Sequence, residues 1–394
     1  MNRRRRSVIP WLAGSLLLAL SVVGCDGEEP PIRIGATMSE SGAYSTQGTA
    51  ARNGYRLCEA DLNGEGGLLG RAVHFEIHDD ASDPAKAVEL YERMIVEDGV
   101  DAVMGPYGST LTEAVAPVTE TYNFIHISPL AATTSIWEQG RRYLFMVLPP
   151  AELFLAGLID LGDRQGYTRV AILEEDQLFP GAAGAGAAEL ARERGMEVVL
   201  HERYSSGTTD FSDFLARVEA EEVEVFAMAA SALDDFQIVV LQMAEHDVNV
   251  RAFGTSGAVE EFRDALGPAA EYVFGLSAWE PGLPNPGSEV FVEAYREIFG
   301  QTPSFHAAGA YGSCRLFAEA VQRAGTLDSD AVRDVLLSLE TTTVFGPFAV
   351  DERGYQTAHQ GVFIQWQEGE KVVVWPDDLA AAEPRIPMPP WSER

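Results

Sequence analysis

The chain has 394 residues, of which 46% are hydrophobic and 22% are charged. It can therefore bury a sizeable core, and its length favours two globular units. Its 60 acidic side chains outnumber the 28 basic ones and give a formal net charge of −32. This charge repels nucleic acid and anionic lipid, which excludes nucleic-acid binding as a function, and it favours solubility.

The N-terminus has the features of a secretory signal. Four consecutive arginines precede an apolar run from Val8 to Val23, which is short for a membrane-spanning helix. The sequence "VVGC" at residues 22–25 resembles the bacterial lipobox, in which cleavage before the cysteine is accompanied by acylation of its thiol. We therefore expect a signal peptide at residues 1–24, a lipid on Cys25 and a short tether over residues 25–31.

After the tether, strand-like and helix-like segments alternate. Residues 32–38 are rich in β-formers, residues 48–63 have helical spacing, residues 66–80 hold a turn and a strand, and residues 83–99 begin with an Asp cap followed by proline. Further strands, most of them separated by helical segments, are expected at "VDAVMGP", "FIHISP", "YLFMVLP", "RVAILEED", "EVVLHERY", "VEVFAMAA" and "VRAFGTS". This order predicts an α/β fold with parallel-rich sheets, which bind ligands at the carboxyl ends of their strands.

No catalytic constellation is evident. The sequence "GAAGAGAAE" (181–189) lacks the last glycine of a dinucleotide fingerprint and is better explained as the start of a helix. "GTSGA" (254–258) lacks the residue order of a nucleophile elbow. His74 and His78 lie on one face of a predicted strand but are too far apart for easy joint ligation of a metal. We therefore expect no enzyme activity, no cofactor and no metal.

The stretch "VMGPYGSTLTEAVAPV" (103–118) runs from a strand into a helix. Thr110 and Glu113 have the spacing of a capping box, which predicts a helix that begins at about Leu111. Its free amide groups and positive dipole end then face the step from Gly108 to Ser109 and suit a small carboxylate. Ordinary capping with nothing bound is the alternative.

The order and spacing of several segments carry a family resemblance. They are "GATMSESGAYSTQG", "AARNGYRLCEADLNGEGGLLGR", "DDASDPAKAVELYERMIVEDGVDAVMGP", "ISPLAATT", "FVEAYREIFGQTPSFHAAGAYGSCRLFAEAVQRAG", "FGPFAVDERGYQ" and the terminal "PPW". Together they resemble the periplasmic leucine/isoleucine/valine-binding family, type I solute-binding proteins that serve ABC importers. The resemblance implies two Rossmann-like α/β lobes joined by three crossings, with a small solute held between them by hinge closure.

The resemblance also implies ligand-binding residues. Ser109 matches the family serine that grips the ligand carboxylate, and Ala131 and Thr133 belong to the loop that completes this grip. Tyr44 occupies the aromatic position of the first loop, and Phe179 replaces a tyrosine of the second lobe.

At Ser256 the sequence departs from the family pattern in the way that matters most for the identity of the solute. It stands where the amino-acid binders place a carboxylate for the substrate ammonium. A zwitterion then loses its charged partner unless Asp234, Asp235 or Glu260 substitutes, because a buried unpaired ammonium is costly. An amide, a urea-like compound or a carboxylate without an ammonium explains Ser256 more simply, while an amino acid stays open. Trp279 either walls the cleft or packs at the hinge.

The expected organisation follows from the resemblance. We place residues 32–148 and 281–328 in lobe 1, residues 149–280 and 329–375 in lobe 2, and residues 376–394 in a C-terminal tail. The expected partners are a small solute, ABC permease subunits with their ATPase, and a membrane reached through the N-terminal lipid alone. We expect a monomer, exported and lipid-anchored at the cell envelope. A ligand-sensing domain for a signalling partner is the alternative.

The two remaining cysteines, Cys58 and Cys314, fall in the same predicted lobe, and an exported chain meets an oxidising compartment. A disulfide between them is therefore one expectation and two free thiols the other. The family's own bridge is not available, because Ser82 and Gly108 occupy those positions.

Overall fold

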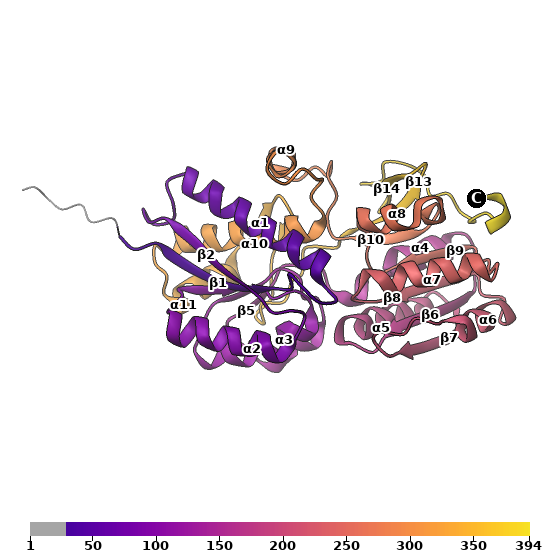
Figure 1. The fold of residues 1–394 in the computed structure, drawn as a ribbon, viewed down its shortest axis with the longest axis horizontal. Coiled ribbons are helices and arrows are strands. Elements are labelled where there is room, and N and C mark those ends of the chain that lie inside the picture. Colours follow the sequence, from indigo (N-terminus) through magenta and orange to yellow (C-terminus); the bar gives the residue numbers. More distant parts are fainter. Residues whose placement is uncertain (1–28) are drawn as a thin grey trace, which may run out of the picture.

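The computed structural model describes residues 29–394, so the predicted signal peptide and the acylated Cys25 lie outside the described residues. Two lobes lie side by side along the longest axis of the molecule (Figure 1). Each contains a sheet with helices on both faces, as the alternation of strands and helices predicts.

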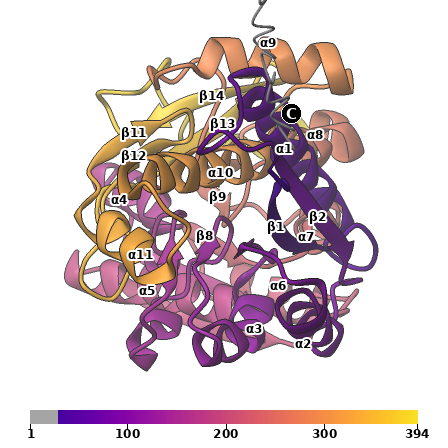
Figure 2. The same cartoon turned by 90° about the vertical axis from the view of Figure 1, so that its left-hand side faces the viewer.

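The first lobe is built on five parallel strands in the order β2-β1-β3-β4-β5. Their bounds are β1 Ile32–Met38, β2 Val73–Asp79, β3 Ala102–Met104, β4 His126–Ser128 and β5 Leu144–Met146. One face carries α1 (Ser45–Gly64) and α10 (Phe305–Ala324), and the other carries α2 (Pro84–Arg93) and α3 (Ser109–Thr121) (Figure 2). Helix α2 begins as predicted, with Pro84 in the first turn and the Asp83 side chain accepting from the Ala85 amide at 2.9 Å.

The second lobe is built on seven strands in the order β14-β13-β10-β9-β8-β6-β7. Their bounds are β6 Arg169–Glu175, β7 Glu197–Tyr204, β8 Val225–Ala229, β9 Ala252–Thr255, β10 Phe274–Ser277, β13 Val362–Gln367 and β14 Glu370–Trp375. Strands β13 and β14 are antiparallel to their neighbours, and the other pairs are parallel. The helices are α4 Ala156–Arg164, α5 Leu178–Glu193, α6 Ser212–Ala220, α7 Leu233–Glu245 and α8 Glu260–Leu266. The glycine- and alanine-rich stretch 181–189 lies inside α5, as the helical interpretation predicts.

Three segments connect the lobes. The chain leaves the first sheet after β5, returns after β10 and leaves again after β12 (Gly346–Phe348) to reach β13. Between the second and third crossings lie α9 (Ser288–Phe299), α10, α11 (Ser329–Ser338) and β11 (Thr341–Thr343). Three adjacent connections form a hinge in two-lobed proteins of this kind.

Helix α11 differs in position from the expected lobe division, which grouped residues 329–375 with the second lobe. The helix packs against α10. Its Asp330 accepts a hydrogen bond from the Tyr143 hydroxyl at 2.8 Å, and Arg333 donates to the Arg142 carbonyl. The segment from α11 to β12 therefore lies beside the five-stranded sheet, and β13 is the first later element that joins the seven-stranded sheet.

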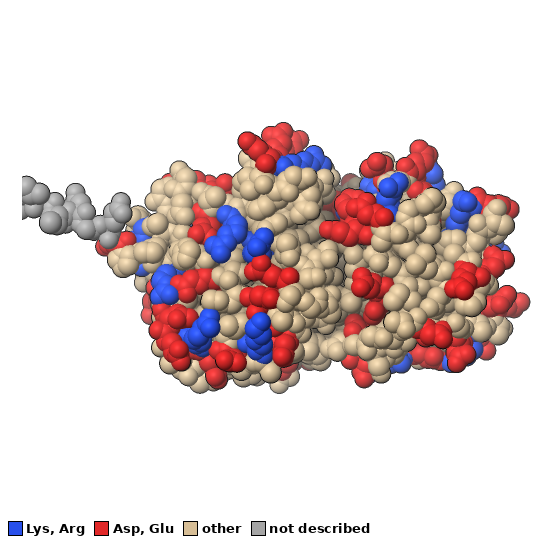
Figure 3. Space-filling model, viewed as in Figure 1, with Lys and Arg blue, Asp and Glu red and all other residues tan. Residues whose placement is uncertain are grey.

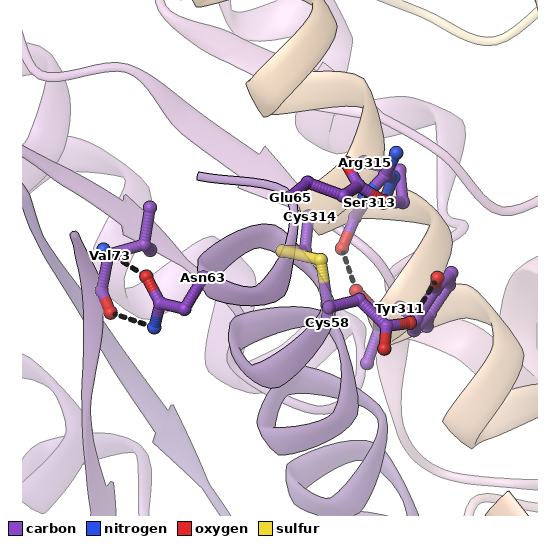
Figure 4. Close-up of a disulfide and its surroundings, with 10 residues drawn as sticks. Cys58, Asn63, Glu65, Val73, Tyr311, Ser313, Cys314 and Arg315 are labelled. Atoms are coloured by element: carbon purple, nitrogen blue, oxygen red, sulfur yellow. Dashed lines mark hydrogen bonds and ion pairs between the residues drawn. A yellow bond between two sulfur atoms is a disulfide. The ribbon is translucent and has the colours of Figure 1, made fainter. Parts of the chain in front are cut away.

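A disulfide joins the two helices on one face of the first sheet (Figure 4). Cys58 of α1 and Cys314 of α10 are bonded, with their Cα atoms 6.4 Å apart and both side chains fully buried. Around this bond, the Tyr311 hydroxyl donates to Asp61 at 2.7 Å and Arg315 pairs with Glu65 at 3.0 Å. These contacts fix α10, which comes late in the chain, on the first helix.

The C-terminal tail packs along the second lobe. The Met388 amide donates to the Arg251 carbonyl at 2.8 Å, and the Trp391 indole donates to the Val248 carbonyl at 2.9 Å. The tail contains no α-helix over residues 376–394, in keeping with its many prolines. No helix of residues 29–394 combines the length and the apolar composition needed to cross a bilayer.

Candidate functional site

The candidate site lies between the lobes, where the carboxyl ends of strands in both sheets face each other. A small, partly open cavity of about 50 Å³ lies there. Its walls include Gln47, Tyr107 and His306 from the first lobe and Phe179, Ser231 and Ser256 from the second. The cavity is therefore built by side chains of both lobes.

The loop after β4 brings three of the predicted binding residues together. Ser109 Oγ accepts hydrogen bonds from the amides of Ala132 at 3.1 Å and Thr133 at 3.3 Å. Ala131 is buried in the same loop. The Thr133 hydroxyl is buried and has no hydrogen-bond partner among residues 29–394. Thr133 lines a second opening between the lobes, and none of Ser109, Ala131 and Thr133 lines the first cavity.

The predicted capping box is wrong. Helix α3 begins at Ser109, and Gly108 precedes it with φ 82°, a left-handed conformation that glycine adopts without strain. Glu113 does not cap the helix, because its carboxylate forms a bidentate ion pair with Arg141. In this pair Arg141 Nη2 lies 2.8 Å from Glu113 Oε1. Thr110 instead donates from its hydroxyl to the Gln177 side chain of the second lobe at 3.0 Å. The first amides of α3 still lie at the Gly108–Ser109 step.

Phe179 and Ser256 both line the cavity from the second lobe. Phe179 packs edge-on against Phe154, with ring centroids 4.9 Å apart. The Ser256 hydroxyl lies at 3.2 Å from the Ala230 amide and 3.3 Å from its carbonyl oxygen. Ser256 therefore ties the end of β9 to the end of β8, and its hydrogen-bonding capacity is directed at the backbone.

Two buried carboxylates stand behind the second-lobe wall. Glu175 accepts from Ser206 Oγ at 2.6 Å and from the Ser231 amide at 2.9 Å, and Asp235 accepts from the Tyr204 hydroxyl at 2.7 Å. Neither has an ion-pair partner among the described residues. Burial raises the pKa of Asp235 to about 6, and the charge of Glu175 adds to this rise while the Tyr204 hydrogen bond opposes it.

Tyr44 and His306 extend the first-lobe wall around Tyr107. The rings of Tyr44 and Tyr107 are 5.3 Å apart, and those of Tyr107 and His306 are 5.6 Å apart. Burial raises the pKa of Tyr44 to about 12, and the negative charges of Glu175 and Asp235 contribute across the cleft. Burial lowers the pKa of His306 to about 3, so its ring is neutral at physiological pH.

The lobes are in contact through polar side chains. Besides the bond from Thr110 to Gln177, the Ser231 carbonyl accepts from Tyr107 Oη and from Gln47 Nε2, each at 3.4 Å. Ser231 also donates its amide to Glu175. The lobes therefore contact each other across the cleft, and two of these hydrogen bonds meet at the Ser231 carbonyl.

Asp234, Asp235 and Glu260, the acids that could replace the carboxylate missing at position 256, lie in different environments. Asp234 is exposed, while Asp235 is 6% exposed. Glu260 pairs with Lys371 at 3.4 Å, and Lys371 also pairs with buried Glu280 at 2.8 Å. Of these acids, Asp235 alone is both buried and free of a basic partner among the described residues. Trp279 is fully buried and packs against Phe291 at 5.7 Å rather than lining the cavity.

The histidines of β2 do not lie together at a metal site. His74 is exposed and contacts Glu59. His78 lies near Glu76 and Asp98, with ligand atoms within 4.8 Å of one another. Arg33 binds Glu76, and Arg93 binds both His78 and Asp98, so guanidinium groups already satisfy this cluster.

Sequence reasoning missed Glu175, Tyr204, Gln47 and His306. Glu175 and Tyr204 are the last residues of parallel strands β6 and β7, and such positions face the cleft in α/β sheets. That signal was available in the sequence. His306 gave no such signal, because it lies near the start of α10, nearly two hundred residues after the elements it meets.

Comparisons with known proteins agree with this architecture. The family model described as "Periplasmic binding protein" matches residues 31–371. The Leu/Ile/Val-binding protein homolog 7 of Brucella suis biovar 1 is 24% identical over 94% of this chain and 99% of its own length.

Two solved structures show the same fold. The substrate-binding protein LivJ of Streptococcus pneumoniae, in complex with isoleucine, superposes with a TM-score of 0.78 at 23% identity, covering 88% of this chain and 100% of that one. A solute-binding protein from R. palustris, in complex with benzoate, superposes with a TM-score of 0.78 at 17% identity, covering 89% and 99%. The two-lobed fold, the interlobe cavity and these matches agree, and the chain belongs to the leucine/isoleucine/valine-binding family of type I periplasmic binding proteins.

Proposed function

We propose that this protein is the solute-binding component of an ABC importer, and that its lobes close over a small solute and present it to permease subunits. The observation that carries the proposal is the cavity whose walls come from both lobes. A solute that contacts both walls stabilises the closed form, and this differential affinity is what drives a hinge. Family membership implies export to the periplasm.

We further propose that Cys25 carries the lipid anchor. The arginines, apolar run and "VVGC" sequence support this. A tether of a few residues then separates Cys25 from β1, which begins at Ile32. The described residues are consistent with attachment through the N-terminal lipid alone, since none of their helices qualifies as a membrane span.

The first lobe supplies a seat for a carboxylate. Ser109 begins a helix of 13 residues, and the helix N-terminus favours negative charge. The Thr133 hydroxyl beside it is buried and unpaired within residues 29–394, which is costly unless a ligand atom satisfies it. Isoleucine and benzoate, the ligands of the two solved relatives, are both carboxylates. A carboxylate-bearing solute is therefore the preferred class for this part of the site.

The test measures the binding of isoleucine, benzoate and their amides to the full chain by thermal shift and calorimetry. We expect a carboxylate to bind best and the Ser109→Ala and Thr133→Val variants to weaken it by about 1–3 kcal/mol, because a charged acceptor loses a donor. Ser338→Ala, an exposed hydroxyl at the end of α11, is the matched control. Unchanged affinity in both cleft variants would contradict the carboxylate seat. Absence of binding by every solute tested would contradict solute capture by the cleft.

A further inference from the structure

Five of the side chains that line the cavity between the lobes are aromatic rings of Phe or Tyr. Tyr107 and Phe305 come from the first lobe, and Phe154, Phe179 and Phe236 come from the first crossing and the second lobe. The face of an aromatic ring carries negative potential and attracts a cation within about 6 Å of its centroid. Rings on several sides of one cavity are the arrangement that proteins use to bind alkylated ammonium groups.

The charge behind these rings has the sign that such a ligand requires. Glu175 and Asp235 are 3% and 6% exposed, and both lack a basic partner within residues 29–394. A buried carboxylate without a counter-ion is costly, so a cation bound close to the two acids is favoured. The described residues that line the cavity include no lysine or arginine. Lys371, which lies near His306, is held by Glu280 and Glu260.

The hydrogen bonds around the cavity show what kind of cation fits. Neither Glu175 nor Asp235 lines the cavity itself, and the Ser256 hydroxyl is directed at Ala230. A primary ammonium has three N–H donors that each need an acceptor. A quaternary ammonium has none, and it gains from aromatic faces and from the field of buried acids alone. The loss of a directly facing acid at position 256 is therefore compatible with a cation, provided that the cation needs no hydrogen bonds.

We infer that the solute carries a positively charged, N-alkylated ammonium group, which the aromatic rings enclose on the cavity side of Glu175 and Asp235. This inference rests on the proposed function and names the solute class of the same cavity. Ser109 and Thr133 do not line this cavity, and Thr133 lines the second opening between the lobes. A solute that fills the cavity alone is therefore a simple quaternary amine, whereas a betaine-like zwitterion has to extend from the cavity to the carboxylate seat.

The experiment compares solutes that differ in one atom. Glycine betaine and choline are titrated into the full chain by calorimetry, each beside the isosteric analogue in which carbon replaces the quaternary nitrogen. We expect at least one charged member to bind about tenfold more tightly than its carbon analogue, because the analogue keeps the shape and loses the cation–π and ionic attraction. Equal affinity within each pair would overturn the inference.

Two variants test whether Asp235 and Phe179 provide the attraction for the cation. Asp235→Asn and Phe179→Leu are expected to weaken the charged solute about tenfold and to change the carbon analogue by less than about twofold. Asp264→Asn, an exposed acid on α8 of the same lobe, is the matched control and is expected to change neither. Equal weakening of both members by Asp235→Asn would show a structural effect and overturn the assignment.

The outcomes separate this inference from the proposed function. Tight binding of isoleucine or benzoate, lost in Ser109→Ala, together with no binding of either quaternary amine, overturns the cation and leaves solute capture standing. Failure of every solute to bind overturns both.

Discussion

At the scale of single residues, Asp235 stands out as a buried carboxylate whose titratable neighbours are acidic or neutral. It lies in the first turn of α7, it is almost fully buried, and its neighbours with titratable side chains are Glu175 of β6, Tyr204 of β7, Asp234 of its own helix and Tyr44 of the first lobe. None of these supplies a positive charge. An acid held in this way is typical of a binding site, where stability is given up for function.

We predict that Asp235→Asn stabilises the free protein above pH 6. Because the folded-state pKa of Asp235 is raised to about 6, the ionised carboxylate disfavours folding at neutral and alkaline pH. This penalty disappears as the pH falls from about 6 to about 4, where the folded protein takes up the proton. Asparagine keeps an acceptor for Tyr204 and carries no charge. The expected gain is about 1–3 kcal/mol at pH 8, with little difference at pH 4.

Urea unfolding of both proteins at pH 8 and pH 4 measures this difference. Asp264→Asn, which removes an exposed acid of the same lobe, is the control and is expected to change stability by less than about 0.5 kcal/mol. A gain that is the same at both pH values would contradict the electrostatic explanation.

At the scale of secondary-structure elements, the contact between α1 and α10 organises the first lobe. These helices pack face to face, and α10 reaches the first lobe only after the chain has passed through most of the second lobe. The backbone of Gly54 lies against Ala307, where a Cβ would be 2.2 Å from the Ala307 carbonyl oxygen. The helices therefore approach closely, and the disulfide between Cys58 and Cys314 joins them at the same contact.

We predict that the double variant Cys58→Ser, Cys314→Ser loses about 2–5 kcal/mol of unfolding free energy. The bond closes a loop with a sequence separation of 256 residues, so its removal restores conformational freedom to the unfolded chain. Denaturant unfolding measures the loss, and the wild-type protein treated with reductant is expected to match the variant. Alkylation of both thiols in denatured, unreduced wild-type protein would contradict the bond.

At the scale of the whole molecule, charge is the dominant feature. Acidic residues are distributed over both lobes in the view of Figure 3. The proposed cleavage before Cys25 would remove four arginines and no acid, leaving 24 basic and 60 acidic side chains and a net charge of −36. The acids outnumber their available partners, so surface ion pairs cannot neutralise the excess, and like charges oppose the compact state.

We predict that the melting temperature of the soluble mature chain rises by about 2–4 °C between about 10 mM and about 300 mM NaCl, because salt screens the excess repulsion. Thermal unfolding without solute measures the effect. Potassium chloride of equal ionic strength is expected to give the same rise, which distinguishes screening from binding of a particular ion. A melting temperature that falls with salt would show that attractive ion pairs outweigh the repulsion.

The sequence by itself determined the class of fold and the strand ends from which the predicted carboxylate seat is built. The alternation of apolar strands and helices is a local pattern, because each element buries one face against its neighbours, and it predicted β1 to β9 in order. Ser109, Ala131 and Thr133 come from two successive strand ends, and parallel strands in one sheet bring such ends together.

Only the tertiary structure decided the rest of the site. Glu113 has the spacing of a cap, but Arg141 lies within reach of its carboxylate and forms an ion pair instead. Asp235 is buried and Asp234 is exposed because of how α7 is rotated against the sheet. Two adjacent aspartates give no sign in the sequence of which one faces inward. The ring of aromatic side chains around the cavity comes from segments up to about two hundred residues apart, and it exists only once the lobes are in contact. Long-range packing, rather than local preference, therefore sets the charge and shape of this cavity.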